Sequence, residues 1–231
     1  MAYQGYTTFK AQAEDGILTV TFDFGTVNVQ GQEMFADLNG LAMRLERDRD
    51  IKVVVFQSAN PEIWVCHYDT NLLKDMSTEA VSREEAKLLD LQVVLERISK
   101  LPQATIAKLE GFARGGGHEF ALACDMRFAA RGKYKFMQME VGMGILPCGG
   151  GASRMARQVG LGRALEIVLS ARDFDADEAE ALKAEAYWLY QATSKTPAVK
   201  RFQIADDQGL EHDMENQRNW ETLVMNVQDI K

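Results

Sequence analysis

The hydrophobic pattern changes its period several times along the first sixty residues. Residues 6–24 form two β-prone runs on either side of Asp15-Gly16, a dipeptide typical of a hairpin turn. Residues 31–49 place apolar side chains at helical spacing and charged side chains between them. Residues 51–59 form a short β-branched run, typical of a buried strand with parallel neighbours. The pattern therefore predicts a hairpin, a helix and a buried strand in that order.

The next forty residues give one irregular stretch and one helix. Residues 60–73 show no clear period and are expected to be irregular. Residues 82–100 repeat at helical spacing, and Ser82 followed by Glu85 is a capping-box pattern that predicts where the helix begins. The buried stripe of this helix is predicted to consist of Leu88, Leu91, Leu95 and Ile98.

The remainder of the chain changes from strands to helices. Residues 103–111 predict one more strand, and residues 126–139 predict two short strands around Arg131-Gly132. After Pro147 the pattern gives short helices separated by Gly or Asp, and from residue 183 onward it is helical without strand signals. The chain thus divides into a β/α core, which ends near residue 145, and a helical C-terminal part.

Composition and charge exclude several classes of protein. The 231 residues are 46% hydrophobic and 26% charged, which is ordinary for a globular protein, and the net charge of -8 argues against a nucleic-acid-binding surface. Three widely spaced cysteines do not make a disulfide framework, so we expect a reducing, cytoplasmic location. No basic, apolar leader and no apolar run of about 20 residues is present, so neither a signal peptide nor a membrane span is expected.

The run Gly115-Gly116-Gly117 stands between a predicted strand and a helix expected to begin near His118. Glycine allows a ligand to approach the backbone, and the N–H groups at a helix start attract an anion or a developing oxyanion. The same run also suits a tight turn in which a side chain would clash, and the glycines alone slightly favour that interpretation. A dinucleotide-binding fingerprint is excluded because position 120 is Phe, and P-loop and G-x-S-x-G patterns are absent.

Two carboxylates favour a ligand-binding role for the glycine turn over a purely structural one. Glu119 lies in the first turn of an otherwise apolar helix, directly after the glycines, where it could serve as a general acid or base. Glu140 stands at the end of an apolar strand and before a second glycine-rich turn, a usual place for a catalytic side chain. Each residue has a simpler interpretation as an ordinary helix-terminal or strand-end charge. Together they point to acid-base chemistry beside an oxyanion-binding turn.

The chain resembles the crotonase family, also called the enoyl-CoA hydratase/isomerase superfamily, over roughly residues 6–182. The likeness rests on separated motifs in the family order, at residues 27–38, 51–73, 104–130 and 136–160. It implies an α/β fold: a crotonase-like β/α spiral core over residues 1–182, and a helical segment over residues 183–231.

The resemblance also implies a site and a substrate class. The backbone N–H groups of Tyr68 and Gly116 would bind the thioester oxygen of an acyl-CoA, and Glu119 and Glu140 would flank its α and β carbons. The implied reaction is hydration of a 2-enoyl-CoA in fatty acid metabolism, by a homotrimer or a dimer of trimers (a hexamer). Coenzyme A is part of the substrate, and no separate cofactor is expected. Isomerisation, hydrolysis or decarboxylation of an acyl-CoA, or non-catalytic binding of CoA esters, remain as alternatives.

This chain departs from the family pattern at several positions. The usual A-G-A-D sequence is replaced by residues 66–69, C-H-Y-D, so the ring of Tyr68 adds bulk beside the acyl pocket. His67 and His118 are candidates for that pocket, with structural roles as the alternative. Neither is spaced for metal binding, and no metal is expected. Cys148 replaces a small residue and is expected only to pack.

The chain is also shorter than the family pattern after Leu182. The family continues from this point with a further stretch, whereas Lys183 here begins a segment that resembles a later family region. About 30 residues are absent by comparison with usual domain lengths. We therefore expect either a true deletion or a break in the chain between Leu182 and Lys183.

Overall fold

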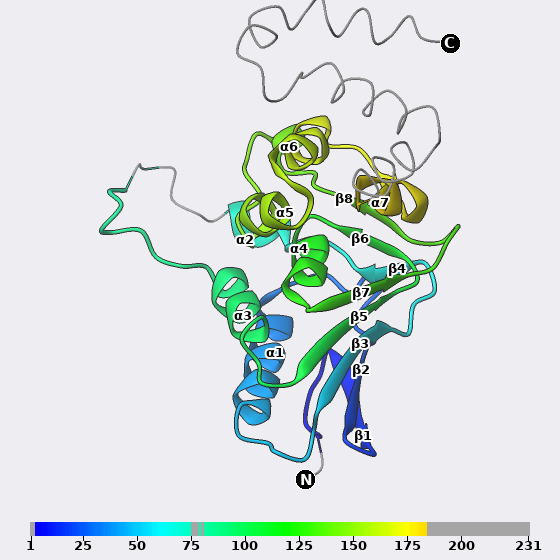
Figure 1. Cartoon of the computed structure of the whole chain (residues 1–231). Coiled ribbons are helices and arrows are strands. Elements are labelled where there is room, and N and C mark those ends of the chain that lie inside the picture. The colour runs from blue at the N-terminus through cyan, green and yellow to red at the C-terminus, as the bar shows by residue number, and fades with distance from the viewer. Residues whose placement is uncertain (1–2, 75–78, 80, 184–231) are drawn as a thin grey trace, which may run out of the picture. The chain divides into compact units, whose positions relative to one another are not determined.

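The computed structural model describes residues 3–74, 79 and 81–183 (Figure 1). Contacts divide the chain into two units, Met1–Ala179 and Glu180–Lys231, and the described residues lie in the first unit except for the end of the last helix. That helix runs without interruption across Leu182 and Lys183. The rest of the helical segment predicted for residues 183–231 lies outside the described residues, so its structure stays a prediction.

The first sheet contains the predicted hairpin and its parallel neighbours. Its five strands lie in the order β1-β2-β3-β5-β7. Their bounds are β1 Phe9–Glu14, β2 Ile17–Phe22, β3 Val53–Ser58, β5 Ala104–Leu109 and β7 Met126–Ala129. β1 and β2 pair antiparallel across Asp15-Gly16, and the other three pairings are parallel. The hairpin and the parallel strand predicted at residues 51–59 are therefore confirmed.

The second sheet is built from shorter strands in the order β4-β6-β8-β9. Their bounds are β4 Ile63–Val65, β6 Phe112–Arg114, β8 Lys135–Met137 and β9 Phe174–Asp175. The first three are parallel, and β9 runs antiparallel to β8. The hydrophobic pattern predicted β8 but neither β4, β6 nor β9. Strands of two or three residues are too short to show a period, and they form here because neighbouring strands supply their hydrogen bonds.

The two sheets are connected by a repeating path of the chain. The consecutive pairs β3 and β4, β5 and β6, and β7 and β8 each give one strand to the first sheet and one to the second, as can be followed in Figure 1. Each circuit of the chain therefore adds one layer to a β/α spiral, which confirms the predicted fold class. Arg131-Gly132 lies between β7 and β8, where the chain passes from the first sheet to the second.

Helices cover the spiral and close its C-terminal side. The helices are α1 Gln32–Leu45, α2 Thr70–Lys74, α3 Asp90–Ile98, α4 Gly116–Ala123, α5 Gly151–Val159, α6 Leu161–Ser170 and α7 Ala176–Lys183, with a 3-10 turn η1 at Val141–Met143. α1 packs against α3, and α5 packs against α4 and α6. The helix predicted within residues 31–49 and the short helices predicted after Pro147 are confirmed.

The helix predicted from Ser82 begins eight residues later, at Asp90. The Ser82 N–H and hydroxyl do bond the Glu85 carboxylate, at 3.1 and 2.7 Å, but these bonds close only a turn. Residues 81–88 are exposed, and Leu88, predicted to be buried, is 71% exposed. A short helix needs an apolar face packed against a neighbour, and this stretch has none within the described residues. The other three members of the predicted stripe are buried.

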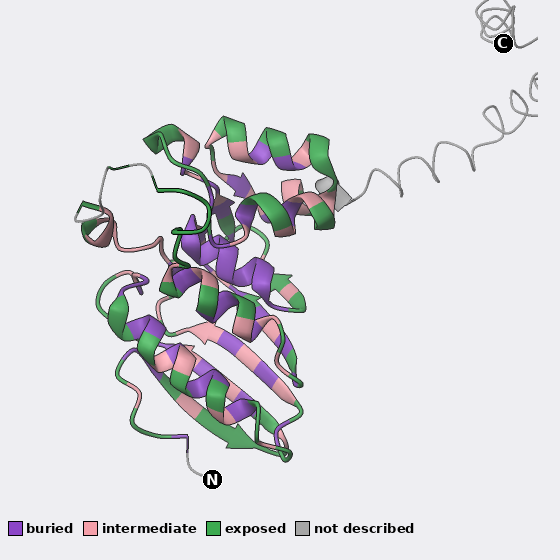
Figure 2. Ribbon diagram, turned by 90° about the vertical axis from the view of Figure 1, so that its left-hand side faces the viewer, coloured by how far each residue is buried: buried purple, intermediate pink, exposed green. Residues whose placement is uncertain are grey.

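The helix that carries the glycine turn is held at the centre of the core. Every residue of α4 is buried, in contrast with the outer helices (Figure 2). The ring of Phe120 lies 5.6 Å from that of Phe22, 5.0 Å from Phe56 and 5.4 Å from Trp64, measured between ring centroids. These aromatic contacts come from both sheets, and they fix the position of the residue next to Phe120 in the sequence, Glu119.

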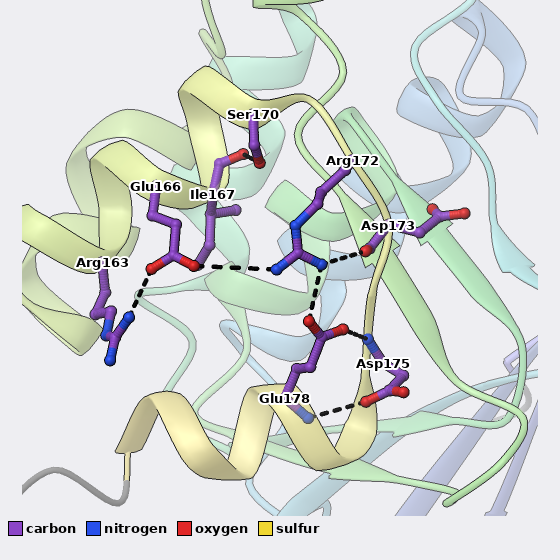
Figure 3. A network of polar contacts seen from close by, with 8 residues as sticks. All are labelled: Arg163, Glu166, Ile167, Ser170, Arg172, Asp173, Asp175 and Glu178. Carbon is purple, nitrogen blue, oxygen red and sulfur yellow. Dashed lines mark hydrogen bonds and ion pairs between the residues drawn. The ribbon is translucent and has the colours of Figure 1, made fainter.

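A network of polar contacts fastens the start of α7 to α6 (Figure 3). The Asp175 carboxylate accepts a bond from the Glu178 N–H at 2.9 Å, and the Glu178 carboxylate accepts one from the Asp175 N–H at 3.1 Å, which caps α7. Arg172 contacts Glu178 at 2.8 Å and Glu166 of α6 at 4.0 Å. The network thereby fixes the position of the first turn of α7 at the end of the spiral.

Candidate active site

One cavity of about 80 Å³ brings together five of the six site residues predicted from the sequence. Tyr68, Gly116, Glu119, Glu140 and His67 all line it. Most of the remaining wall is apolar, from Leu91, which the sequence placed in a buried helix stripe, and from side chains that the sequence did not single out: Leu89, Met139, Met143, Ile145 and Leu146. Leu89 lies directly before α3, and the other four come from the segment after β8, where no period was available to identify them. The cavity is therefore an apolar chamber with two carboxyl groups.

The N–H groups of Tyr68 and Gly116 are free to bind a ligand. Gln30 accepts a bond from the Asp69 N–H at 2.9 Å and donates one to the His67 carbonyl at 3.0 Å. Residues 67–69 are extended, and in an extended segment successive N–H groups point in alternate directions. Because the Asp69 N–H points toward Gln30, the Tyr68 N–H points away from it. Gly116 is the first residue of α4, where an N–H has no acceptor within the helix. Neither N–H has an acceptor among the described residues.

The two N–H groups lie close together because the glycine turn permits it. A Cβ atom on Gly116 would lie only 3.2 Å from the Tyr68 nitrogen. Gly115, which precedes the helix, has φ +49°, a left-handed conformation that glycine adopts without strain. Two adjacent, unpaired N–H donors at a helix start are the arrangement that binds a carbonyl oxygen as it gains negative charge.

Glu119 is held in the cavity wall by the glycine turn that precedes α5. Its side chain is 1% exposed, and its Oε1 accepts a bond from the Gly151 N–H at 2.7 Å. Burial raises the pKa of this carboxyl to about 7, with a further contribution from the charge of Glu140. A carboxyl group with this pKa can both give and take a proton near neutral pH.

Glu140 reaches the same cavity from the other side of the glycine turn. Glu140 lies after β8, directly before η1, and it is 8% exposed. Its Oε1 would lie 3.0 Å from a Cβ atom on Gly115, which places the carboxyl group against that turn. Its Oε2 is buried without a hydrogen-bond partner among the described residues, and burial raises its pKa. An unpaired, buried carboxyl oxygen facing a cavity is available to a substrate or a water molecule.

His67 lies at the edge of the cavity and is paired with Cys66. The hydrogen bond between the two side chains raises the pKa of His67 to about 9, although burial opposes this shift. Burial also opposes ionisation of Cys66, yet the bond to His67 lowers the pKa of the thiol. The His67 Nδ1–H donates to the Tyr68 carbonyl at 2.7 Å. His67 therefore holds the backbone of residues 67–68 as well as lining the cavity.

His118 does not line the cavity, although the sequence made it a pocket candidate. It is 5% exposed, and its ring centroid lies 4.3 Å from that of Phe136. The Gln138 amide donates to its Nδ1 at 3.0 Å. Burial lowers the pKa of His118 to about 3, so the ring is neutral and packs in the core. Neighbouring side chains on a helix point in different directions. His118 therefore faces away from the cavity that Glu119 lines.

Within the described residues, no group of three or more His, Cys, Asp or Glu side chains is arranged to hold a metal ion. No helix in the same part of the chain is long and apolar enough to span a membrane. Cys148, which the sequence suggested would only pack, also lines the cavity.

The raised pKa of Glu119 predicts that Glu119→Gln stabilises the protein above neutral pH. In the folded protein the carboxyl stays protonated up to about pH 7, whereas its ordinary pKa is 4.5. Between these values the unfolded chain binds fewer protons than the folded one, so the free energy of unfolding falls as the pH rises.

Glutamine cannot ionise and keeps the oxygen that accepts from Gly151. We expect a gain of about 3 kcal/mol at pH 8 and none at pH 4, measured by urea unfolding. An equal effect at both pH values would contradict the raised pKa.

Comparison with known proteins places these features in a family. The family model described as "Enoyl-CoA hydratase/isomerase" matches residues 12–182. Human mitochondrial methylglutaconyl-CoA hydratase is 35% identical over 157 residues, covering 68% of this chain and 45% of that protein. The short-chain-enoyl-CoA hydratase of Clostridium acetobutylicum is 32% identical over 153 residues, covering 66% of this chain and 57% of that protein. The chain thus spans about half the length of these curated relatives.

Solved structures agree with the sequence comparison. The crystal structure of an enoyl-CoA hydratase from Geobacillus kaustophilus is similar with a TM-score of 0.70 at 28% identity, covering 99% of this chain and 90% of that one. The region that the family model matches, residues 12–182, contains every residue that lines the cavity described above. The spiral core, the glycine turn and these matches together show that the chain belongs to the enoyl-CoA hydratase/isomerase family, the crotonase superfamily.

Proposed function

We propose that the protein hydrates a 2-enoyl-CoA, adding water across the double bond next to the thioester. The observation that carries this proposal is the conjunction in one cavity of two unpaired N–H donors, of Tyr68 and Gly116, with two buried carboxyl groups, of Glu119 and Glu140. The family membership supports an acyl-CoA substrate. Coenzyme A enters as part of that substrate, and the proposed reaction uses no further cofactor.

The two N–H groups bind the thioester oxygen in the proposed mechanism. As water attacks the β carbon, the double-bond electrons move toward the thioester, and its oxygen gains negative charge. Donors fixed in the backbone need no reorganisation when this charge develops, and each is worth about 3 to 4 kcal/mol of barrier lowering. The apolar wall strengthens this effect because it excludes bulk water.

The two glutamates move the protons. One carboxylate takes a proton from the water molecule whose oxygen bonds to the β carbon, and the other carboxyl group gives a proton to the α carbon of the enolate. The net change is one hydrogen on the α carbon and one hydroxyl on the β carbon. Burial raises the pKa of both groups and the charge of Glu140 raises that of Glu119, which favours a pair that holds one proton near neutral pH.

A direct assay separates hydration from the other reactions open to this family. With a short trans-2-enoyl-CoA, hydration removes the ultraviolet absorbance of the conjugated thioester and yields 3-hydroxyacyl-CoA. Isomerisation moves the double bond without adding water, and hydrolysis releases free thiol. Formation of the hydroxy product at a saturable rate supports the proposal. Release of thiol, or a shifted double bond with no hydroxy product, would replace hydration by one of those reactions.

We also propose a homotrimer or a dimer of trimers. An exposed apolar stripe along α6 supports an interface, with Leu161, Leu165 and Leu169 exposed by 68%, 46% and 62%. Light scattering should give three or six times the chain mass of 25.9 kDa. A monomeric mass would contradict the proposed trimer without affecting the proposed active site.

A further inference from the structure

Cys148 lies in the wall of the cavity that contains the two glutamates. The residue is exposed, so its thiol stands where the cavity meets the protein surface. A Cβ atom on the next residue, Gly149, would lie 2.5 Å from the Glu119 Oε2, so the backbone that carries the thiol touches this carboxyl group. The Cys148 thiol donates to the Leu146 carbonyl at 3.0 Å, which leaves the sulfur lone pairs unused. The thiol therefore adjoins the place where the proposed reaction occurs.

The same cavity has the features of a ligand-binding site apart from the thiol. Glu140 is 8% exposed, and its Oε2 is buried without a partner among the described residues. The free N–H groups of Tyr68 and Gly116 fix the thioester oxygen in the proposed mechanism. The cavity encloses only about 80 Å³, so the carbon atoms next to the thioester fill it. A substrate held in this way brings its β carbon close to the wall residues, including Cys148.

The surroundings of Cys148 keep its thiol protonated. Burial raises the pKa of the thiol, and the charges of Glu119 and Glu140 raise it further. A neutral thiol is a weak nucleophile until a base removes its proton. An ordinary thiol has a pKa of about 8.5, whereas bulk water has a pKa of about 15.7. A carboxylate placed to take a proton from water therefore takes one from a thiol much more readily.

We propose, on the basis of the function proposed above, that Cys148 is a covalent attachment site for 2-enoyl thioesters, in which its sulfur adds to the β carbon in place of water. The S–H bond breaks, its proton passes to one carboxylate, and the electron pair left on sulfur forms the S–C bond. The double-bond electrons move to the thioester, whose oxygen is bound by the N–H groups of Tyr68 and Gly116. The other carboxyl group then gives a proton to the α carbon. The product is a thioether between Cys148 and the acyl-CoA, and its formation needs no oxidant or reductant.

The thioether closes the cavity until the reverse reaction removes it. In that reaction a carboxylate takes the α proton, the S–C bond breaks, and the double bond and the thiol form again. The inhibiting class consists of 2-enoyl thioesters whose β carbon is open to attack. Propenoyl-CoA, which has no β substituent, should form the adduct. 3-Methyl-2-butenoyl-CoA, which carries two methyl groups at the β carbon, should not.

The three cysteines of the chain allow a test by selectivity. Burial opposes ionisation of Cys66, yet its hydrogen bond to His67 lowers the pKa of the thiol. Cys124 is 3% exposed, and burial raises its pKa to about 12. Iodoacetamide reacts with thiolates without needing a binding site, so it should label Cys66 before Cys148 and leave Cys124 unlabelled. Propenoyl-CoA should label Cys148 first, because the cavity supplies the base and the oxyanion donors.

The adduct is measured by mass spectrometry of the intact protein after an acid quench, which stops elimination, and is located by peptide mapping. We expect the mass of one propenoyl-CoA to be added to the unaltered protein and to Cys66→Ser, and not to Cys148→Ser. Glu119→Gln and Glu140→Gln should each slow the addition about 100-fold, the lower end of the usual worth of acid-base catalysis. Glu14→Gln should not slow it, and iodoacetamide labelling of Cys148 should not slow in any glutamate variant.

Three results would overturn the inference. They are the absence of an adduct at Cys148, labelling of Cys66 before Cys148 by propenoyl-CoA, and a rate of addition at Cys148 that neither Glu119→Gln nor Glu140→Gln changes. The outcome is distinguishable from the fate of the proposed function. Hydration without an adduct at Cys148 would remove the attachment site and keep the hydratase. A glutamate-dependent adduct without hydration would keep the attachment site and remove the hydratase.

Discussion

Glu119→Gln and Glu140→Gln should each lower the turnover of a 2-enoyl-CoA by about two to four powers of ten, the usual worth of positioned acid-base catalysis. Glutamine has nearly the size of glutamate and keeps one oxygen, so the Gly151 N–H retains its acceptor. KM should change little, because neither carboxyl group holds the thioester oxygen. The double variant should lose much less than the product of the two single losses, because groups that act together are not additive.

The matched control is Glu14→Gln, which makes the same change at an exposed position in β1 and should keep full activity. Circular dichroism and unfolding should show that all four variants are folded, with Glu119→Gln more stable than the unaltered protein at pH 8. Full hydratase activity in Glu140→Gln beside an inactive Glu119→Gln would contradict the two-acid mechanism and favour a one-acid reaction.

Gly116→Pro should lower kcat by about 100- to 1000-fold relative to Gly116→Ala, the usual effect of removing one oxyanion donor. Both variants add a Cβ atom, which would lie 2.2 Å from the Gln30 Oε1, so both require the Gln30 side chain to move. Only proline removes the N–H. Gly116 is the first residue of α4, the helical position where proline is best tolerated.

The comparison can be repeated with Gln30→Ala present in both variants, which removes the clash. A difference between proline and alanine that persists in this background assigns the loss to the missing N–H. Equal activity of the two variants would show that the Gly116 N–H does not bind the thioester oxygen.

The features predicted well from the sequence are those with local causes. The β1–β2 hairpin follows from Asp15-Gly16, and the burial of β3 follows from its β-branched run. Glu119 stood out because it lies in the first turn of an otherwise apolar helix, directly after three glycines that could bind an oxyanion. The pairing of Glu119 with Glu140 in one cavity was implied by the family resemblance, because 20 intervening residues give no distance in space.

The features that escaped prediction depend on contacts distant in the sequence. β4 and β6 are three-residue strands that form because they pair with each other, and β6 also pairs with β8. Leu88 had the spacing of a buried residue, but no neighbour among the described residues covers it. His118 was a pocket candidate through its position beside Glu119, and only packing against Phe136 shows that it faces elsewhere. The contact of Glu119 with Gly151 likewise needs the folded chain.

The most direct test of hydration is the fate of labelled solvent. The protein is incubated with a 2-enoyl-CoA in deuterium oxide enriched in oxygen-18, and the product is analysed by mass spectrometry and NMR. Hydration by the site formed by Tyr68, Gly116, Glu119 and Glu140 predicts 3-hydroxyacyl-CoA with one deuterium on the α carbon and one oxygen-18 on the β carbon, and near-complete loss of this product in the Glu119→Gln, Glu140→Gln double variant. Deuterium without oxygen-18 in a shifted enoyl-CoA, or oxygen-18 only in a released carboxylate, would contradict it.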